Sequence, residues 1–185
     1  MTGDGQTQRA VFLDRDGVIN QPVVREGKSY PPDRVEDFAL IEGVSQACTQ
    51  LKDAGFLLLV VTNQPDVRTG KQSLAEVEAM HDKLRNLLPV DDISACFHVN
   101  ADNCACRKPR PGMLLQAAER HGVNLSTSYM VGDRRGDIEA GQRAGCSCFF
   151  IDYHYREAGP QGTFRTVADL HEAAEHILAR ANQKR

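Results

Sequence analysis

The chain has 185 residues, which suits one domain with a core of ordinary size. Its 41% hydrophobic and 25% charged residues are typical of a soluble globular protein, and a net charge of -3 gives no reason to expect a nucleic-acid partner. No apolar run approaches the ~20 residues that span a bilayer. The polar segment 1–9 lacks the apolar core of an export signal. We expect it to be a flexible tail, and residues 10–185 to form a single cytoplasmic domain.

Short apolar runs alternate with segments of helical periodicity. Strands are expected at residues 10–13, 56–61, 93–97, 128–131 and 146–151. Helices are expected at residues 44–54, 74–88, 111–120, 137–144 and 167–179. The segment 21–42, with three prolines and one glycine, is expected to be an irregular loop. Strands that alternate with helices predict an α/β fold with three layers, in which helices cover both faces of a parallel sheet.

Residues suited to chemistry follow several of the predicted strands. Asp14 and Asp16 come directly after the first strand, Thr62 after the second, Lys108 shortly after the third, and Asp133 after the fourth. Parallel strands present their carboxyl ends at one edge of the sheet, so these side chains should converge. Each motif alone could be a solvated turn. Together, carboxylates with a lysine and a hydroxyl suit Mg²⁺ and a phosphoryl group.

Four soft or borderline metal ligands lie close together in the second half of the chain: Cys96, His98, Cys104 and Cys106. In a chain without an export signal, clustered thiols suggest a metal before a disulfide. Spacing alone leaves the alternatives open: a zinc site, or else ordinary loop thiols or a redox pair. The remaining cysteines lie in apolar surroundings and are interpreted as core residues: Cys48, Cys146 and Cys148.

The order Asp14-x-Asp16, Thr62, Lys108 and Gly132-Asp133, with Asp137 following, resembles the haloacid dehalogenase (HAD) superfamily of phosphohydrolases over residues 10–150. The segments Phe12–Asn20, Thr62–Gln64 and Cys104–Pro109 are similar to one branch of it. That branch holds D-glycero-D-manno-heptose-1,7-bisphosphate 7-phosphatase and histidinol-phosphate phosphatase. The resemblance implies a Rossmann-like fold and cytoplasmic, Mg²⁺-dependent hydrolysis of a phosphomonoester.

The resemblance also implies catalytic roles. Asp14 would be the nucleophile that forms an aspartyl-phosphate, and Asp16 would protonate the leaving oxygen and then activate water. Mg²⁺ would bind Asp14, Asp133 and the backbone carbonyl of Asp16. Thr62 would hold phosphoryl oxygens, while Lys108 would balance the charge of the transferred group.

Two further points follow from the resemblance. Zinc would occupy Cys96, His98, Cys104 and Cys106, and this closed ligand set implies a structural zinc. It would stiffen the loop 96–106 that leads to Arg107, Lys108 and Arg110. Asp137 has two alternative roles, as a water-mediated metal ligand or as the residue that orients Lys108.

No insertion is long enough for a large cap, so the site should be open, with a rim formed by residues 21–34, 64–72 and 98–110. We expect a monomer or weak dimer. The basic residues at the rim are Arg25, Lys28, Arg34, Arg68, Lys71, Arg107, Arg110, Arg134 and Arg135. The same segments contain only four acidic residues: Glu26, Asp33, Asp66 and Asp102.

The excess of basic over acidic residues at the rim favours a substrate with a second phosphate. We therefore expect removal of the 7-phosphate from a heptose 1,7-bisphosphate. Arg107 and Arg110 are the best candidates for recognising that second phosphate, with Arg25, Lys28 and Lys71 as solvated charges. Asn63, Gln64 and Arg134 complete the candidate substrate-binding residues. The short segment between His98 and Cys104 is more like the histidinol-phosphate phosphatases, which keeps that activity, or another sugar-phosphate phosphatase, as the alternative.

Overall fold

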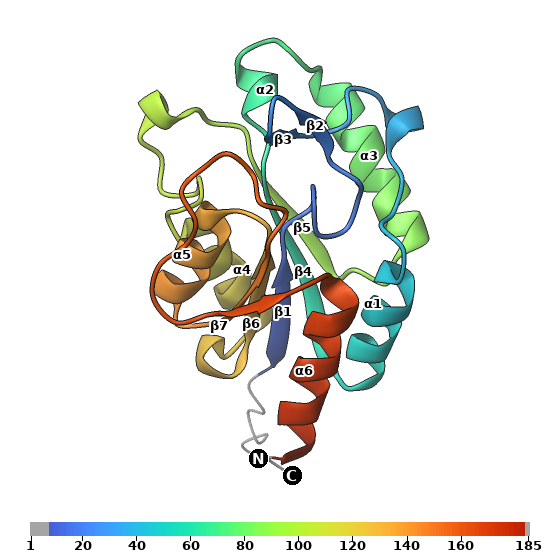
Figure 1. Ribbon diagram of the computed structural model, residues 1–185, viewed down its shortest axis with the longest axis vertical. Coiled ribbons are helices and arrows are strands. Elements are labelled where there is room, and N and C mark those ends of the chain that lie inside the picture. The colour runs from blue at the N-terminus through green and yellow to red at the C-terminus, as the bar shows by residue number, and fades with distance from the viewer. Residues whose placement is uncertain (1–7, 184–185) are drawn as a thin grey trace.

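The computed structural model describes residues 8–183 and has a six-stranded sheet at its centre (Figure 1). All neighbouring strands in this sheet are parallel. From edge to edge they are β5 (Asp92–Cys96), β4 (Phe56–Asn63), β1 (Arg9–Leu13), β6 (Tyr129–Gly132), β7 (Ser147–Ile151) and β8 (Arg165–Val167). The predicted parallel sheet is confirmed.

Helices cover both faces of the sheet, as predicted. The α-helices are α1 (Val44–Asp53), α2 (Pro65–Arg68), α3 (Leu74–Leu87), α4 (Gly112–His121), α5 (Arg135–Ala144) and α6 (Leu170–Gln183). Residues of α1, α3 and α6 share one apolar core with the sheet, whereas α4 and α5 share the other. Figure 1 shows the two groups on opposite sides of β1 and β4. No described helix is both long and apolar enough to cross a membrane.

Strand β1 lies in the middle of the sheet, between β4 and β6. Val11 and Leu13 face the core formed with α1 and α6, while Ala10 and Phe12 face the core formed with α4 and α5. All four side chains are inaccessible to solvent. Because successive side chains of a strand point to opposite faces, burial on both sides fixes the depth at which β1 ends and delivers Asp14.

The N-terminal boundary differs from the prediction. Arg9 belongs to β1, where it pairs with Phe56, and Gln8 forms a bridge with Val123. The expectation of a flexible tail is therefore wrong for these two residues. The rest of that predicted tail, residues 1–7, lies outside the described part of the chain.

The segment 21–42 contains a β-hairpin that was not predicted. Strands β2 (Val23–Arg25) and β3 (Lys28–Tyr30) are antiparallel and are joined by Glu26 and Gly27, with φ angles of 53° and 76°. Positive φ at both positions is the geometry of a tight two-residue hairpin turn, which matches the twist of the strands. The hairpin lies beyond the carboxyl end of the sheet in Figure 1, at the end where the candidate site residues converge.

Candidate active site

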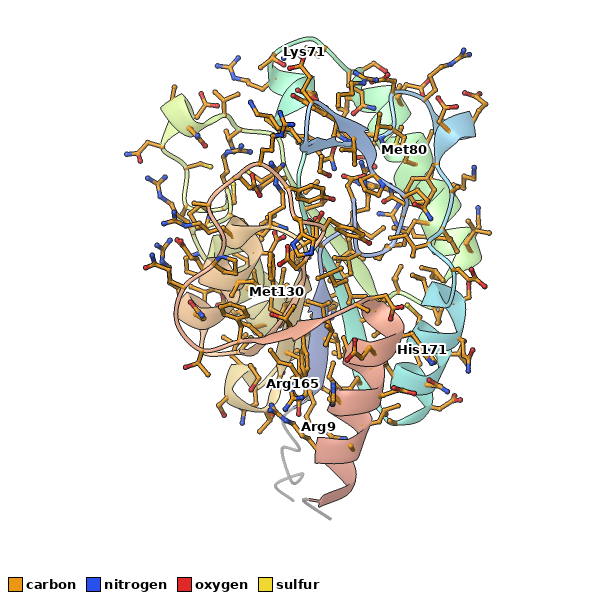
Figure 2. The ribbon with its side chains drawn as sticks, in the orientation of Figure 1. Arg9, Lys71, Met80, Met130, Arg165 and His171 are labelled. Carbon is orange, nitrogen blue, oxygen red and sulfur yellow. The ribbon has the colours of Figure 1, made fainter. Side chains whose placement is uncertain are left out.

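A cavity of about 580 Å³ opens at the carboxyl end of the sheet. Asp14, Thr62 and Lys108 line it together with residues 28–31 of the hairpin and residues 134–137 at the start of α5. Lys71, counted with the predicted rim, lies at this end of the molecule but outside the cavity, and Arg9 marks the opposite end (Figure 2). The predicted convergence of strand ends is confirmed, and no large cap covers the cavity within residues 8–183.

Lys108 forms a buried ion-pair network at the base of the cavity. Its ammonium group lies 2.6 Å from Asp14 Oδ1 and 2.7 Å from Asp137 Oδ1, and it donates a hydrogen bond of 2.6 Å to the Val61 carbonyl. The second oxygen of Asp137 accepts a hydrogen bond from the Arg134 amide at 3.0 Å. Both oxygens of Asp137 are thus engaged, and the geometry supports its role in orienting Lys108.

The electrostatics of this network follow from burial and close charges. Burial, opposed by Lys108 and assisted by Asp137 and Asp16, raises the pKa of Asp14 from 3.8 to about 7. Burial alone would lower the pKa of Lys108, but Asp137 and Asp14 outweigh it and raise that pKa, so Lys108 stays charged. Buried carboxylates that lack enough neighbouring positive charge are costly in free energy, and a bound cation would lower that cost.

Asp133 is the side chain best prepared for that cation. It is 1% exposed, and burial together with Asp14 and Asp137 raises its pKa well above the ordinary value. Its Oδ1 atom is buried and has no hydrogen-bond partner. One carboxylate oxygen from each of Asp14, Asp133 and Asp137 lies within 4.8 Å of the others. An oxygen-rich set with an unpartnered buried oxygen fits a hard divalent cation such as Mg²⁺.

Gly17 allows this close packing. Its φ is +90°, and a Cβ at this position would lie 2.1 Å from Asp133 Oδ2. A larger residue would therefore displace Asp133, which explains why the acidic strand end is followed by glycine.

Asp16 also lines the cavity, and three side chains hold its carboxylate. Arg15, which is fully buried, approaches it to 3.0 Å, Asn20 donates at 3.0 Å and Gln64 donates at 2.8 Å. Gln64 also donates to the Thr62 hydroxyl at 2.9 Å and is itself fully buried. The structure thus places Gln64, a candidate substrate ligand, behind Asp16 rather than at the cavity. The role of Arg15 was not predicted from the sequence, because only the folded turn shows that its side chain pairs with Asp16.

The other candidate substrate-binding residues divide into two groups. Asn63 and Arg107 line the cavity, and the Asn63 amide exchanges hydrogen bonds of 3.0 and 3.1 Å with the backbone of Lys108. Arg107 is held by the Asn100 side chain at 2.8 Å and the His98 carbonyl at 3.2 Å. Arg110, in contrast, donates to Asn103 and to the Cys104 carbonyl, which turns it toward the loop 96–106.

The charges on the cavity wall are mostly paired. Arg134 lines the cavity and forms an ion pair with Glu157 at 2.8 Å, and Arg135 pairs with Glu139. Lys28, interpreted from the sequence as a solvated charge, also lines the cavity. Among residues 8–183, neither Lys28 nor Arg107 has an acidic partner within ion-pair distance, so these two carry the uncompensated positive charge of the wall.

A tyrosine that the sequence interpretation did not assign to the site reaches Asp133. Tyr155 lies in the loop after β7, and its hydroxyl donates a hydrogen bond of 2.9 Å to Asp133 Oδ2. The two residues are 22 positions apart, and no periodic signal connects them.

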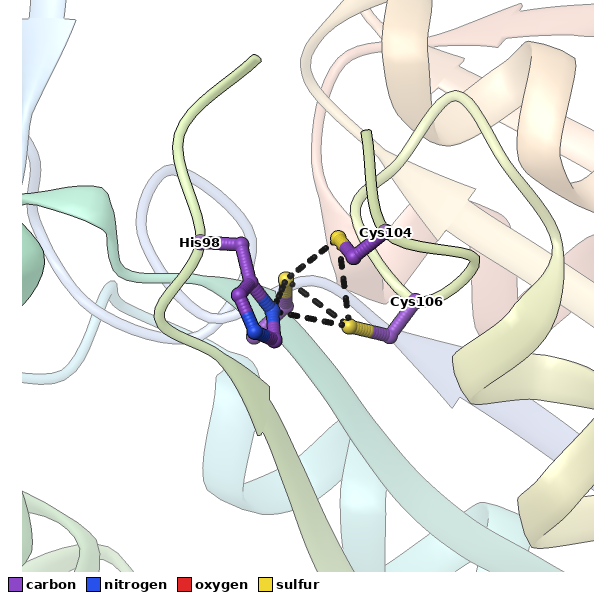
Figure 3. Close-up of side chains that lie close together, drawn as sticks. His98, Cys104 and Cys106 are labelled. Atoms are coloured by element: carbon purple, nitrogen blue, oxygen red, sulfur yellow. Dashed lines mark hydrogen bonds between the residues drawn. The ribbon is translucent and has the colours of Figure 1, made fainter. Parts of the chain in front are cut away.

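The four predicted zinc ligands converge in the loop beside Lys108. Figure 3 shows the side chains of His98, Cys104 and Cys106 pointing toward one another. The Cys96 sulfur lies 3.7 Å from that of Cys104 and 3.1 Å from that of Cys106. The three sulfurs lie 3.1–3.7 Å apart, and His98 Nδ1 lies 3.3 Å from Cys106 and 3.5 Å from Cys96. Tetrahedral zinc with Zn–S bonds of about 2.3 Å places ligand atoms roughly 3.5–4 Å apart. The observed separations of 3.1–3.7 Å are close to these values, and one atom of each of the four residues is in position to ligate a single zinc ion.

Comparisons with known proteins agree with this site. A HAD-hydrolase-like family model matches residues 105–173. The chain is 35% identical to D-glycero-beta-D-manno-heptose-1,7-bisphosphate 7-phosphatase of Bordetella bronchiseptica over 94% of this chain and 99% of the relative. It is 38% identical to the enzyme of the same name from Helicobacter pylori over 75% and 80%.

The structures agree as well. The crystal structure of D,D-heptose 1,7-bisphosphate phosphatase from B. bronchiseptica, complexed with magnesium and phosphate, matches with a TM-score of 0.81 and 31% identity. The match covers 94% of this chain and 99% of that one. The chain is a phosphatase, and it belongs to the HAD-like hydrolases, in the family of the D-glycero-D-manno-heptose-1,7-bisphosphate 7-phosphatases.

Proposed function

We propose that this enzyme removes the 7-phosphate from D-glycero-D-manno-heptose 1,7-bisphosphate through an aspartyl-phosphate intermediate. One observation carries the choice of substrate. Asp14 and Lys108 form the reactive floor of the cavity, and its wall carries Lys28 and Arg107, which have no acidic partner in the described part of the chain. A bisphosphate would place one phosphate on the floor and the other at the wall. The names of the relatives support the same substrate.

The residues divide the reaction into two steps. Lys108 holds Asp14 Oδ1, which leaves the other oxygen to attack phosphorus. The bond between phosphorus and the sugar oxygen breaks, and Asp16 donates a proton to that oxygen. Water, deprotonated by Asp16, then attacks the aspartyl-phosphate and releases inorganic phosphate. Mg²⁺ held by Asp14, Asp133 and the Asp16 carbonyl would neutralise phosphate charge in both steps.

The charges of the cavity also bear on the alternative substrate. Histidinol phosphate carries an ammonium group, which would be attracted by free carboxylates. Two of the acids in the wall, Glu139 and Glu157, are neutralised by Arg135 and Arg134. Asp66 also lines the cavity and has no ion-pair partner among the described residues, but two unpaired cations, Lys28 and Arg107, outweigh it. The uncompensated charge of the wall is therefore positive, which favours a second phosphate over an amine.

A substrate panel tests the proposal. Phosphate release is measured with both anomers of the heptose bisphosphate, with histidinol phosphate and with a simple sugar monophosphate, each with and without Mg²⁺. We expect the highest kcat/KM with one of the bisphosphate anomers, and no turnover without the cation. A higher kcat/KM for histidinol phosphate would overturn the choice of substrate.

The Arg107→Ala substitution is expected to raise KM for the bisphosphate about 10- to 100-fold, and to change KM for a monophosphate by less than about twofold. The reason is that one charge-assisted phosphate contact contributes roughly 1.5–3 kcal/mol. Steady-state kinetics on both substrates check this. Arg85→Ala is the control, because Arg85 pairs with Asp82 on the exposed face of α3. Equal effects of Arg107→Ala on both substrates would contradict recognition of a second phosphate.

We further propose that the cysteine and histidine cluster binds a structural zinc ion. Metal analysis of purified protein should find about one zinc per chain, because four ligands form a closed site. Cys106→Ser should lose the zinc and lower Tm, since metal binding stabilises the folded loop. Cys148→Ala, which removes a buried thiol on β7, should keep the zinc. Zinc-free wild-type protein with full activity and unchanged Tm would refute this role.

We propose that the enzyme acts in the cytoplasm as a monomer or weak dimer. Three zinc-binding thiols remain available in a reducing compartment. The large exposed apolar side chains of the described chain are scattered over separate elements, among them Val24, Leu74 and Leu115. Isolated apolar residues of this kind do not form an extensive interface.

A further inference from the structure

The loop after β7 connects the cation site to the hairpin. It contributes Tyr155, whose hydroxyl lies 2.9 Å from Asp133 Oδ2. Its neighbour Arg156 contacts the hairpin, whose strand β3 carries Ser29, a residue of the cavity lining that is 7% exposed. Hydrogen bonds of two adjacent residues, Tyr155 to Asp133 and Arg156 to Gly27, therefore connect the loop to the cation site and to the hairpin.

Backbone contacts fix this loop against the hairpin. The Arg156 amide donates to the Gly27 carbonyl at 2.9 Å. The Arg156 side chain packs so closely on Gly27 that a Cβ there would lie 2.8 Å from it. On the other side of Tyr155, His154 has a φ of 55° and its amide donates to Asp152 Oδ1 at 2.8 Å. The position of the Tyr155 hydroxyl is thus set from both sides.

The two oxygens of Asp133 have different environments. Oδ2 accepts the Tyr155 hydrogen bond, whereas Oδ1 is buried without a partner. The Tyr155 hydroxyl is the donor in this bond, so it holds Oδ2 in place and leaves Oδ1 for a cation. Hydrogen bonds to a ligating carboxylate fix its orientation and are a large part of metal affinity.

We propose that Tyr155 is a positioning residue, which orients Asp133 for Mg²⁺ and couples cation binding to the hairpin that lines the substrate cavity. This inference rests on the proposed Mg²⁺ site. Because binding free energies are reciprocal, a cation that favours the Tyr155–Asp133 bond also favours the hairpin position that this bond requires, and substrate at the hairpin strengthens cation binding.

The experiment measures Mg²⁺ binding to the full-length protein by isothermal titration calorimetry, and by the rise in Tm with Mg²⁺ concentration. Tyr155→Phe keeps the ring and removes only the hydroxyl. We expect the Kd for Mg²⁺ to rise roughly tenfold, and activity lost at low Mg²⁺ to recover as Mg²⁺ is added. Tyr153→Phe is the matched control, because its ring lies 5.6 Å from that of Tyr155. Its Kd should match wild type.

Arg156→Ala removes the side chain that packs on Gly27, and so separates the link to the hairpin from local support of Asp133. It should raise the Mg²⁺ Kd by less than Tyr155→Phe, and should reduce the tightening of Mg²⁺ binding that inorganic phosphate produces in wild type. Equal Mg²⁺ affinity in wild type and Tyr155→Phe, with only a lower Tm in the mutant, would overturn the inference and leave Tyr155 a purely structural role. Failure of the wild-type protein to bind Mg²⁺ would instead overturn the proposed function.

Discussion

Replacing Asp14 by asparagine is expected to lower kcat by at least about 10³-fold while the protein stays folded. The amide cannot form the acyl phosphate, and removal of a nucleophile usually costs this much or more. The change is nearly isosteric at the end of a fully buried strand, so circular dichroism should match wild type. Phosphate release at saturating substrate and Mg²⁺ measures the loss. Substantial remaining activity would show that Asp14 is not the nucleophile.

The same variant should also change how stability depends on pH. In the metal-free folded protein Asp14 keeps its proton up to a pKa of about 7, whereas the ordinary value is 3.8. Between these values the folded state binds more protons than the unfolded state, so this carboxyl makes stability fall as pH rises. Relative to wild type, Asp14→Asn should therefore gain Tm between pH 4 and pH 7. A parallel pair of Tm curves would contradict the raised pKa.

Replacing Lys108 by methionine is expected to have the second large effect, on both activity and stability. Asp14 and Asp137 would lose their common counter-ion in a buried site, and breaking a buried pair in this way costs about 3–5 kcal/mol. Loss of the charge that faces the transferred phosphoryl group should lower kcat by about 10²–10³-fold. Urea unfolding of the metal-free protein at pH 8 and steady-state kinetics measure the two effects.

A matched lysine provides the control. Lys52 pairs with Asp91 at 2.7 Å, but about a quarter of each side chain is exposed, so Lys52→Met should cost no more than about 1 kcal/mol. Addition of Asp137→Asn to Lys108→Met should recover part of the lost stability, because one of the two unpaired carboxylates is removed. Equal destabilisation by Lys52→Met and Lys108→Met would show that the buried ion-pair network contributes no more to stability than a partly exposed ion pair.

The sequence predicts those parts of the site that depend on strand ends or on neighbours along the chain. Asp14, Thr62 and Asp133 follow buried strands, and a parallel sheet brings its strand ends together. The cluster from Cys96 to Cys106 spans a single loop. For such residues the local pattern and one topological rule are sufficient.

Other parts depend on contacts that no local pattern reveals. The two hairpin strands have only three residues each. The residues of β2 are exposed or half-buried, and those of β3 are mostly polar, so neither strand shows a run of apolar residues that would predict it. Strand β8 is equally short. Tyr155 and Lys28 reach the site only because separate loops dock at the same edge. Gln64 points into the protein because its amide donates a hydrogen bond to Asp16. The position of Gln64 two residues after Thr62 does not predict this contact.

The hairpin bonds its two strands to each other, and they form a sheet of their own, apart from the sheet that contains β1. Segments with few cooperative contacts open locally at a small free-energy cost, whereas a central strand exchanges its amides only when the whole protein unfolds. The hairpin, which contacts the substrate cavity, is therefore expected to have a lower local stability than strand β1, which carries the nucleophile. During evolution, substitutions in the hairpin could change which phosphorylated compound is admitted, while Asp14 keeps its position on the central strand.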